Sequence, residues 1–247
     1  MTTAPVADQH RLLEVQALDT RLQQLVHRRT NLPGHAIVTD LVSRLEDVES
    51  ALVTSRTAAG DLRRELAKAE GDVEQVRARA ARDQARMDSG SASAKDLQAL
   101  TSELTALGRR QAELEDVELA IMERLESHET ALAGLTTARD GVLEHTEQAR
   151  SALAREVAAI DEEIAAVQTE RESLSQGLDA GLVALYDRLR ESSGGLGVAL
   201  LRGRRCEGCR LELNPSDVAK MMSAPVDQVV RCEECSRILV RAADPAR

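Results

Sequence analysis

The sequence of 247 residues contains no phenylalanine, no tryptophan and a single tyrosine, Tyr186. Aromatic rings normally supply much of the apolar area that a thick globular core buries. A chain without them has to bury leucine, valine, isoleucine and alanine along a thin seam between helices. The shortage of aromatic residues therefore argues against a large globular core and favours paired helices.

Long apolar runs are also missing. No stretch approaches the ~18 apolar residues of a membrane-spanning helix, and the start, MTTAPVADQH, lacks the basic flank and apolar run of a signal peptide. We therefore expect a cytoplasmic protein without a membrane partner. All four cysteines lie close together near the C-terminal end, and in a reducing compartment such clustering favours a metal site over disulfides.

What the chain does contain is a regular helical pattern. Alanine, glutamate, leucine and arginine dominate, and charged residues make up 30% of the chain, which is typical of coiled coils. Disorder is the alternative interpretation, but disordered chains lack the regular apolar spacing that this chain has. From Val38 to Met87 the seam positions alternate at spacings of three and four without a break, which predicts a coiled-coil helix. These positions are Val38, Leu41, Leu45, Val48, Leu52, Ser55, Ala59, Leu62, Leu66, Ala69, Val73, Val76, Ala80, Asp83 and Met87.

Breaks in the pattern divide the chain. Pro33-Gly34 predicts a kink near residues 31–36, after an opening helical segment, and the turn-forming stretch near residues 88–94 predicts the tip of a hairpin. Ser93 and Asp96 resemble a helix-start capping pair. The apolar pattern of the return helix shifts phase across Val117, Ile121 and Leu125, which predicts a local change in supercoil.

We therefore predict a mainly α fold, a long antiparallel coiled-coil helical hairpin with a small C-terminal β-rich zinc-ribbon domain. The hairpin is expected over residues 1–191, a Gly/Ser linker over 192–197 and the ribbon over 198–247. Three glycines within residues 194–197 predict the end of the helix there.

Two CxxC pairs separated by twenty-two residues are the most specific motif. This spacing favours one structural Zn²⁺ held by Cys206, Cys209, Cys232 and Cys235, because four thiolates complete a tetrahedral shell and leave no position for a substrate. Iron in a rubredoxin-like site is the main alternative, and unligated cysteines are a third interpretation. Each pair should form a knuckle whose backbone amides point at the sulfurs.

Short apolar stretches around these pairs predict ribbon strands at residues 197–201, 211–213, 229–231 and 238–241. Between them, Asn214 followed by Pro215 predicts the start of a short helix. With so small an apolar core, metal binding should supply much of the folding free energy of this module.

Several segments carry a resemblance that spans nearly the whole chain. They are LLEVQALDTRLQQL with the following NLP, SAKDLQALTSEL, YDRLR, GVALLRGRRCEGC, LNPSDV and CEECSRILV. On these motifs the chain resembles the bacterial C4-type zinc-ribbon family, whose members combine a coiled-coil hairpin with a C-terminal ribbon. A glycine usually follows the fourth cysteine in such ribbons, whereas Ser236 stands there in this chain.

The chain carries a formal net charge of -10, but the ribbon segment is locally basic. Clustered arginines favour phosphate contact, and solvated arginines on an arginine-rich protein are the alternative interpretation. The candidate nucleic-acid-binding residues are Arg202, Arg204, Arg205, Arg210, Arg231 and Arg237, with Arg241 nearby. The absence of phenylalanine and tryptophan removes the stacking platform common in single-strand binders.

We expect no enzyme and no small-molecule substrate, because the sequence shows no catalytic pair and no phosphate-binding glycine loop. Two function classes remain. The family resemblance implies nucleic-acid binding through the ribbon, with the coiled coil as an extended arm. The alternative is a protein–protein adaptor that acts through the hairpin, as members in flagellated bacteria resemble chaperone-type adaptors, and the acidic hairpin fits this class better.

Overall fold

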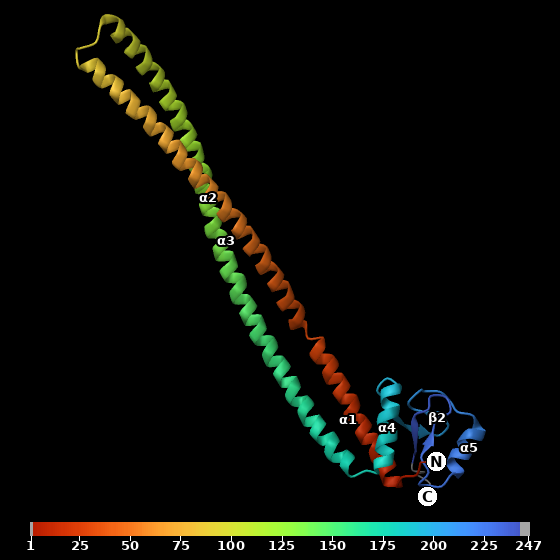
Figure 1. The fold of residues 1–247 in the computed structure, drawn as a ribbon. Coiled ribbons are helices and arrows are strands. Elements are labelled where there is room, and N and C mark those ends of the chain that lie inside the picture. Colours follow the sequence, from red (N-terminus) through yellow and green to blue (C-terminus); the bar gives the residue numbers. More distant parts are fainter. Residues whose placement is uncertain (1, 243–247) are drawn as a thin grey trace. The chain divides into compact units, whose positions relative to one another are not determined.

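The computed structural model describes residues 2–242 and is mainly helical (Figure 1). Four helices come first, followed by a ribbon with four strands and a fifth helix. The elements are α1 (Val6–Thr30), α2 (Pro33–Asp88), α3 (Ala94–Gln176), α4 (Ala180–Ser192), β1 (Val198–Arg202), β2 (Arg205–Cys206), α5 (Pro215–Ser223), β3 (Val230–Arg231) and β4 (Ile238–Arg241). The predicted fold class, a helical hairpin with a small C-terminal strand-containing region, is confirmed.

Contacts divide the chain into two units. One consists of residues 36–150, and the other joins the residues up to 35 with those from 151 onward.

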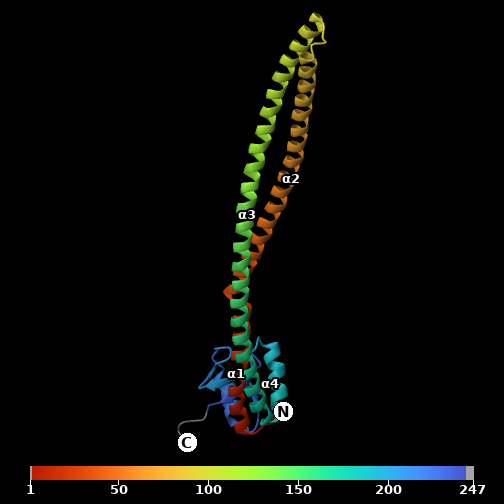
Figure 2. The same cartoon turned by 90° about the vertical axis from the view of Figure 1, so that its left-hand side faces the viewer.

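Residues 36–150 form the antiparallel pair of α2 with the first part of α3 (Figure 2). Every predicted seam residue of α2 is buried or half-buried. Leu62 and Ala69 of α2 pack with Ile121 of α3. Ion pairs of 2.6 Å, Arg63 with Glu129 and Arg77 with Glu115, flank this seam. The regular apolar spacing thus has its expected consequence, a hairpin that buries its own seam.

Two short breaks interrupt the helices of this part of the chain, one before α2 and one between α2 and α3. Helix α1 ends at Thr30 and α2 begins at Pro33. At the tip, the backbone N–H of Asp96 donates to Oγ of Ser93 and the N–H of Ser93 donates to Oδ2 of Asp96, both at 3.2 Å. These reciprocal bonds satisfy amide groups that the first turn of α3 would otherwise leave open.

The predicted phase shift at Val117 is wrong. Val117 is 51% exposed, and Glu118 takes the seam position instead. Buried or half-buried side chains keep one alternation of three and four from Leu100 to Leu153 by accepting polar seam residues such as His128 and Thr146. An apolar pattern could not reveal this, because the stems of polar side chains fill seam positions too.

A further break, in the return helix, was not predicted. Helix α3 ends at Gln176, and α4 begins at Ala180 with Asp179 as its cap. Oδ1 of Asp179 accepts a 2.9 Å hydrogen bond from the backbone N–H of Leu182. Gly177 and Asp179 are the local signals for this turn, since glycine ends helices and aspartate starts them.

The ribbon contains one sheet of strand order β2-β1-β4-β3, with β1 and β4 parallel and the outer pairs antiparallel. The strand predicted at residues 211–213 is not a regular strand. This stretch contributes only an isolated bridge between Arg205 and Glu212. Helix α5 starts at Pro215 as predicted.

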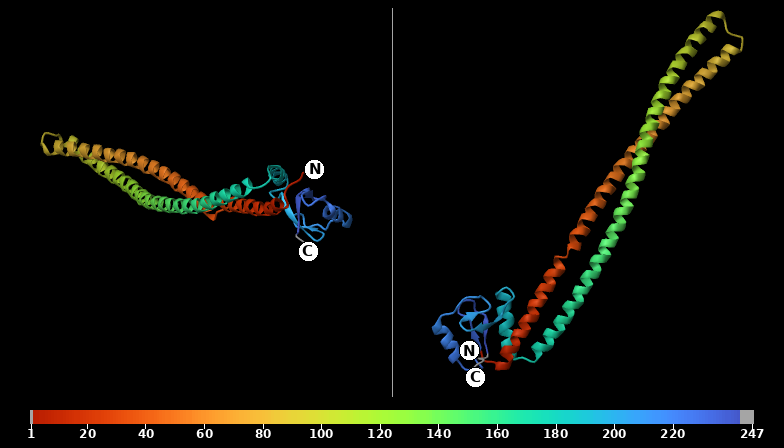
Figure 3. Two further views of the ribbon diagram at one scale, coloured as in Figure 1. Left: turned by 90° about the horizontal axis from the view of Figure 1, so that it is seen from below. Right: turned by 180° about the vertical axis from the view of Figure 1, so that it is seen from behind.

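Both faces of this sheet are covered. Val198, Ile238 and Val240 point to one face and pack against α1 and α4. Ala199, Leu201 and Leu239 point to the other face and pack with α5 and the cysteines. Figure 3 shows α1 and α4 on one side of the strands and α5 on the other. The strands are therefore nearly continuous apolar runs, as expected of a sheet buried on both faces.

Helix α1 is part of this packing. Gln16 accepts a 2.8 Å hydrogen bond at Oε1 from the backbone N–H of Gly197, and its Nε2 donates to the carbonyl of Gly195 at 3.0 Å. Residues 2–4 add to it, because the N–H of Ala4 donates to the carbonyl of Asp227 at 2.8 Å. The predicted boundaries at 191, 192–197 and 198 stay predictions, but the segment expected to be a linker is held by buried hydrogen bonds.

No helix in residues 2–242 combines the length and the apolarity needed to cross a membrane.

Candidate metal centre and ribbon surface

The four cysteines belong to two knuckles with the same backbone geometry. The N–H of Arg210 donates to the carbonyl of Cys206 at 2.8 Å, and the N–H of Ser236 donates to that of Cys232 at 2.9 Å. In return, the N–H of each first cysteine donates to the carbonyl five residues later, at 3.1 Å in the first knuckle and 2.9 Å in the second. The repeated motif Arg-Cys-Glu-x-Cys in the sequence therefore corresponds to a repeated structure.

Each knuckle ends on a residue with left-handed backbone. Arg210 has φ of 64° and Ser236 has φ of 63°, and both directly follow the second cysteine of their pair. Glycine adopts this conformation at no steric cost, whereas other residues are strained there. Ser236 thus keeps the backbone shape that glycine would give to the second knuckle.

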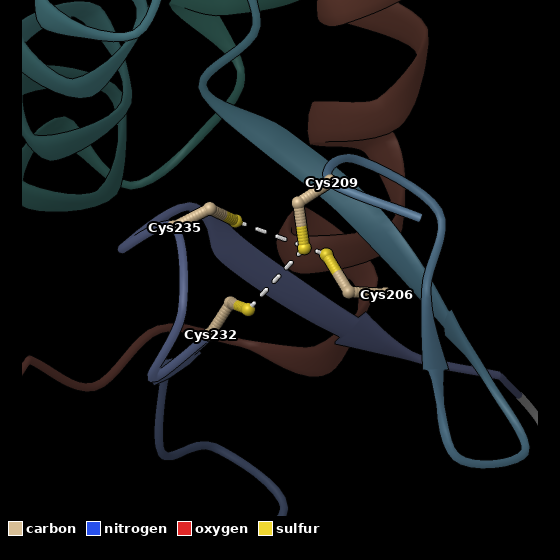
Figure 4. Close-up of side chains that lie close together, drawn as sticks. All are labelled: Cys206, Cys209, Cys232 and Cys235. Carbon is tan, nitrogen blue, oxygen red and sulfur yellow. Dashed lines mark hydrogen bonds between the residues drawn. The ribbon is translucent and has the colours of Figure 1, made fainter. Parts of the chain in front are cut away.

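The sulfurs lie at distances that suit one tetrahedral metal ion. All four ligand atoms are within 4.8 Å of one another, with Sγ of Cys206 3.9 Å from Sγ of Cys235 and Sγ of Cys209 4.0 Å from Sγ of Cys232. Zinc–sulfur bonds of about 2.3 Å in a tetrahedron place the sulfurs roughly 3.8 Å apart. Figure 4 shows the four side chains pointing toward a common centre. The cysteines are therefore the ligand set of one structural zinc ion.

The backbone amides of the knuckles act on the sulfurs as predicted. Burial raises the pKa of the Cys206 thiol, and hydrogen bonds from the amides of Cys209 and Gly208 oppose that rise. Burial likewise raises the pKa of Cys232, and hydrogen bonds from the backbone amides of Cys235 and Glu234 lower it. Because zinc binds thiolates, these amides stabilise the form that the metal needs.

The predicted arginines do not form one surface. Arg205 and Arg231 occupy the same position in the two knuckles, directly before the first cysteine. Nε of Arg205 donates to the carbonyl of Arg210 at 3.1 Å, and Nε of Arg231 donates to that of Ser236 at 2.8 Å. Since β2 and β3 are the two outer strands of the sheet, these arginines lie at opposite edges.

Two further arginines, Arg237 and Arg241, donate hydrogen bonds to backbone carbonyls. Arg237 is half-buried and donates from Nε to the carbonyl of Leu196 at 2.8 Å and from Nη2 to that of Ser193 at 2.9 Å. Arg241 donates to five carbonyls after and within α5, namely those of Met221, Ala224, Pro225, Val226 and Gln228, at 2.8–3.2 Å. Both guanidinium groups therefore stabilise loops of the ribbon.

The remaining candidates surround the β1–β2 turn. Arg202 pairs with Glu207 at 3.8 Å and Arg204 with Glu212 at 3.6 Å. Arg210 is exposed, and no ion pair within residues 2–242 includes it. The net basic character of the ribbon is thus locally offset by glutamates.

The hairpin unit exposes apolar side chains outside its seam. Val53 is 62% exposed and Leu119 is 57% exposed. Met122 and Leu143 are exposed as well. Because these residues lie outside the alternation of three and four that fills the seam, the sequence analysis did not single them out.

Comparisons with known proteins agree with this architecture. Residues 15–194 match the model of the CT398-like coiled coil hairpin domain, and residues 205–239 match that of the C4-type zinc ribbon domain. An uncharacterized protein of Mycobacterium tuberculosis is 36% identical over 238 residues, which cover 96% of this chain and 97% of that protein. One of Mycobacterium leprae is 29% identical over 90% of this chain and 95% of its own length.

Solved structures show the same fold. A protein of Mycobacterium smegmatis with 32% identity has a TM-score of 0.86 and covers 97% of this chain and 100% of its own. CT398 of Chlamydia trachomatis, at 20% identity, has a TM-score of 0.71 and covers 95% of this chain and 98% of its own. The second likeness concerns the fold alone.

Proposed function

We propose that this chain, which belongs to the family of CT398-like coiled-coil hairpin proteins with a C4-type zinc ribbon, is a non-enzymatic adaptor that binds a protein along its hairpin. The observation that carries this proposal is the exposure of large apolar side chains on a hairpin whose seam is already filled. Scattered exposed apolar residues are ordinary, but Leu119 and Met122 line one groove.

The ribbon supports an architectural role in this proposal. Four thiolates fill the shell of a zinc ion and leave no open position for a reacting group. The sheet packs against α1 and α4 on one face and against the cysteines and α5 on the other, so the metal stabilises the sheet on which the two ends of the helical part pack. We therefore assign the zinc ion to stability and the hairpin to binding.

The second candidate is nucleic-acid binding through the first knuckle. It rests on Arg210, whose guanidinium is exposed without a carboxylate partner among the described residues, beside Arg205. Arg202 and Arg204 could also contact phosphate if their ion pairs with Glu207 and Glu212 break, because exposed ion pairs contribute little free energy in water. Arg231 and Arg237 from the predicted set fit less well, because one lies at the opposite edge and the other is half-buried.

Site-specific photo-cross-linking in the cells that make the protein tests the adaptor. A photoreactive residue at Val53, Leu119 or Leu143 should give discrete protein conjugates that mass spectrometry identifies and that purified components reproduce. The same residue at Glu46, an exposed charged position of α2, is the control and should give none.

Anisotropy of labelled RNA and DNA tests the second candidate. Phosphate binding requires an affinity that falls steeply with salt and is lost in an Arg205→Ala/Arg210→Ala variant. That result, together with an absence of protein conjugates from all three hairpin positions, would replace the adaptor by a nucleic-acid-binding protein.

A further inference from the structure

A groove lies on the hairpin unit between α2 and α3. Leu66 of α2 and Leu119, Met122 and Leu125 of α3 supply its apolar lining, and its volume is about 440 Å³. The remaining lining residues are three glutamates of α3, Glu123, Glu126 and Glu129.

The apolar lining continues the seam outward. Leu66 and Leu125 are half-buried and pack against the cluster around Ile121. Leu119 and Met122 do not occupy seam positions, and they are 57% and 46% exposed. The groove thus has an inner wall fixed by the coiled coil and an outer wall of partly exposed side chains, one of them a flexible thioether that adapts to varied apolar surfaces.

The rim of the groove is acidic. Its lining contains three glutamates and no lysine or arginine, and these glutamates belong to a segment of α3, residues 113–129, with seven carboxylates and one arginine, Arg124. Glu129 is paired with Arg63 across the hairpin, at 2.6 Å. No ion pair among the described residues includes Glu123 or Glu126, so both carboxylates can receive cations from outside.

We propose that this groove binds an amphipathic helix of a partner protein whose apolar stripe is flanked by lysine or arginine. An apolar floor with charged edges is the arrangement by which helices dock in grooves, and the sign of the edge selects the sign of the partner. This inference rests on the proposed adaptor function and adds the site and the partner's chemistry.

The same charges argue against two other occupants. A second copy of this chain would bring the acidic face of its own α3 against Glu123 and Glu126, which is unfavourable. Nucleic acid would be repelled by the same carboxylates.

The test uses the full-length zinc-loaded protein and a labelled helical peptide of about 18 residues, with leucine at helix spacing and lysine on both flanks. Anisotropy titrations should give micromolar affinity that weakens with salt. A Leu119→Ala/Met122→Ala variant should lose about tenfold in affinity, because it removes apolar area from the contact. A Glu123→Gln/Glu126→Gln variant should bind more weakly and with a flatter salt dependence.

Matched variants separate this groove from the general surface. Val53→Ala truncates an equally exposed apolar residue outside the groove, and Glu46→Gln/Glu49→Gln removes the same charge from α2; neither should change the affinity. Equal binding of a peptide with the same composition but no apolar stripe would overturn the inference. So would equal binding of a leucine–glutamate peptide, or a dimer of this chain that the Leu119→Ala/Met122→Ala variant abolishes.

The experiments distinguish rejection of the groove as a binding site from rejection of the adaptor function. Protein conjugates at Val53 or Leu143 with no peptide binding would reject this groove and leave the adaptor standing. Absence of conjugates at all hairpin positions would reject the adaptor itself.

Discussion

The phenol hydroxyl of Tyr186 donates a 2.7 Å hydrogen bond to Oδ2 of Asp19, and both side chains are buried. Tyr186 lies on α4 and Asp19 on α1. Arg171 of α3 reaches the same carboxylate, with Nε 3.2 Å from Oδ1, and Nη1 of Arg190 is 3.5 Å from that oxygen. The buried carboxylate of Asp19 thus joins α1 to α3 through Arg171 and to α4 through Tyr186 and Arg190.

Replacing Asp19 with alanine should destabilise the protein by about 3–5 kcal/mol, because Arg171 and Arg190 lose their buried counter-charge. Tyr186→Phe should lose only about 1 kcal/mol, since the carboxylate keeps both arginines. Urea unfolding measures the free energies. Asp161→Ala is the control, because it removes an exposed partner of Arg29 and should lose less than about 1 kcal/mol. Equal losses for Asp19→Ala and Asp161→Ala would contradict the role of the buried carboxylate.

The pH dependence of Tyr186 should reveal its environment. Burial first, and then the hydrogen bond to Asp19, raise the pKa of Tyr186 far above its ordinary value. The folded state therefore holds the phenol proton more tightly than the unfolded state. This contribution to stability is complete below pH ~10 and is lost as the pH rises above it.

Ultraviolet difference spectroscopy reports this directly, because the chain has one tyrosine. The protein unfolded in guanidinium should form phenolate with a midpoint near pH ~10, and the folded protein should not form it until it unfolds. A phenolate midpoint near the ordinary value in a protein that circular dichroism shows to be folded would exclude the buried hydrogen bond.

Gly197 should not tolerate a side chain. A Cβ atom there would lie 2.8 Å from the carbonyl oxygen and from Cδ2 of Tyr186. Gly197→Ala should therefore destabilise the protein by about 1–3 kcal/mol, through strain at the junction of α4 and β1. Gly108→Ala, on an open face of α3, should instead stabilise by about 0.5–1 kcal/mol. Thermal unfolding of both variants checks the prediction, which requires a lower melting temperature for Gly197→Ala and a higher one for Gly108→Ala.

Ser236→Gly should stabilise the ribbon. The left-handed backbone of Ser236 costs a residue with a Cβ atom about 1–2 kcal/mol, and glycine removes most of that strain. The measurement is the rate of zinc transfer to a chelator, which should fall. Ser216→Gly, in the first turn of α5, tests the effect of glycine alone and should not slow the transfer. Faster zinc loss from the Ser236→Gly variant would show that the serine side chain stabilises the knuckle.

Arg241→Lys should destabilise the ribbon by about 2 kcal/mol, because a single ammonium group cannot replace a planar fork that reaches five carbonyls. Chemical unfolding followed through zinc release gives the free energy. Arg210→Lys should leave it unchanged, since Arg210 is exposed. A loss of nucleic-acid affinity at unchanged stability would instead place Arg241 in a binding surface.

The sequence by itself determined the hairpin seam and the metal ligands. Seam contacts follow a fixed period along α2, so every residue from Val38 to Met87 in that alternation is buried or half-buried. Zinc coordination is similarly local, because each CxxC pair forms its own knuckle and four thiolates at this spacing suit one ion. The breaks before Pro33 and at the tip are also local features, because turn-forming residues at those positions end the helices.

The tertiary structure decided what the charged and polar side chains do. Nothing in the local pattern separates Arg210, which is exposed, from Arg241, which binds backbone carbonyls, because the carbonyls that Arg241 binds lie in and after α5. In the sequence Asp19 is one more charged residue on a helix of mixed charge, yet α3 and α4 supply its partners from more than 150 residues away. Periodicity records which face of a helix is apolar, whereas the partner of a buried charge depends on how the chain folds back on itself.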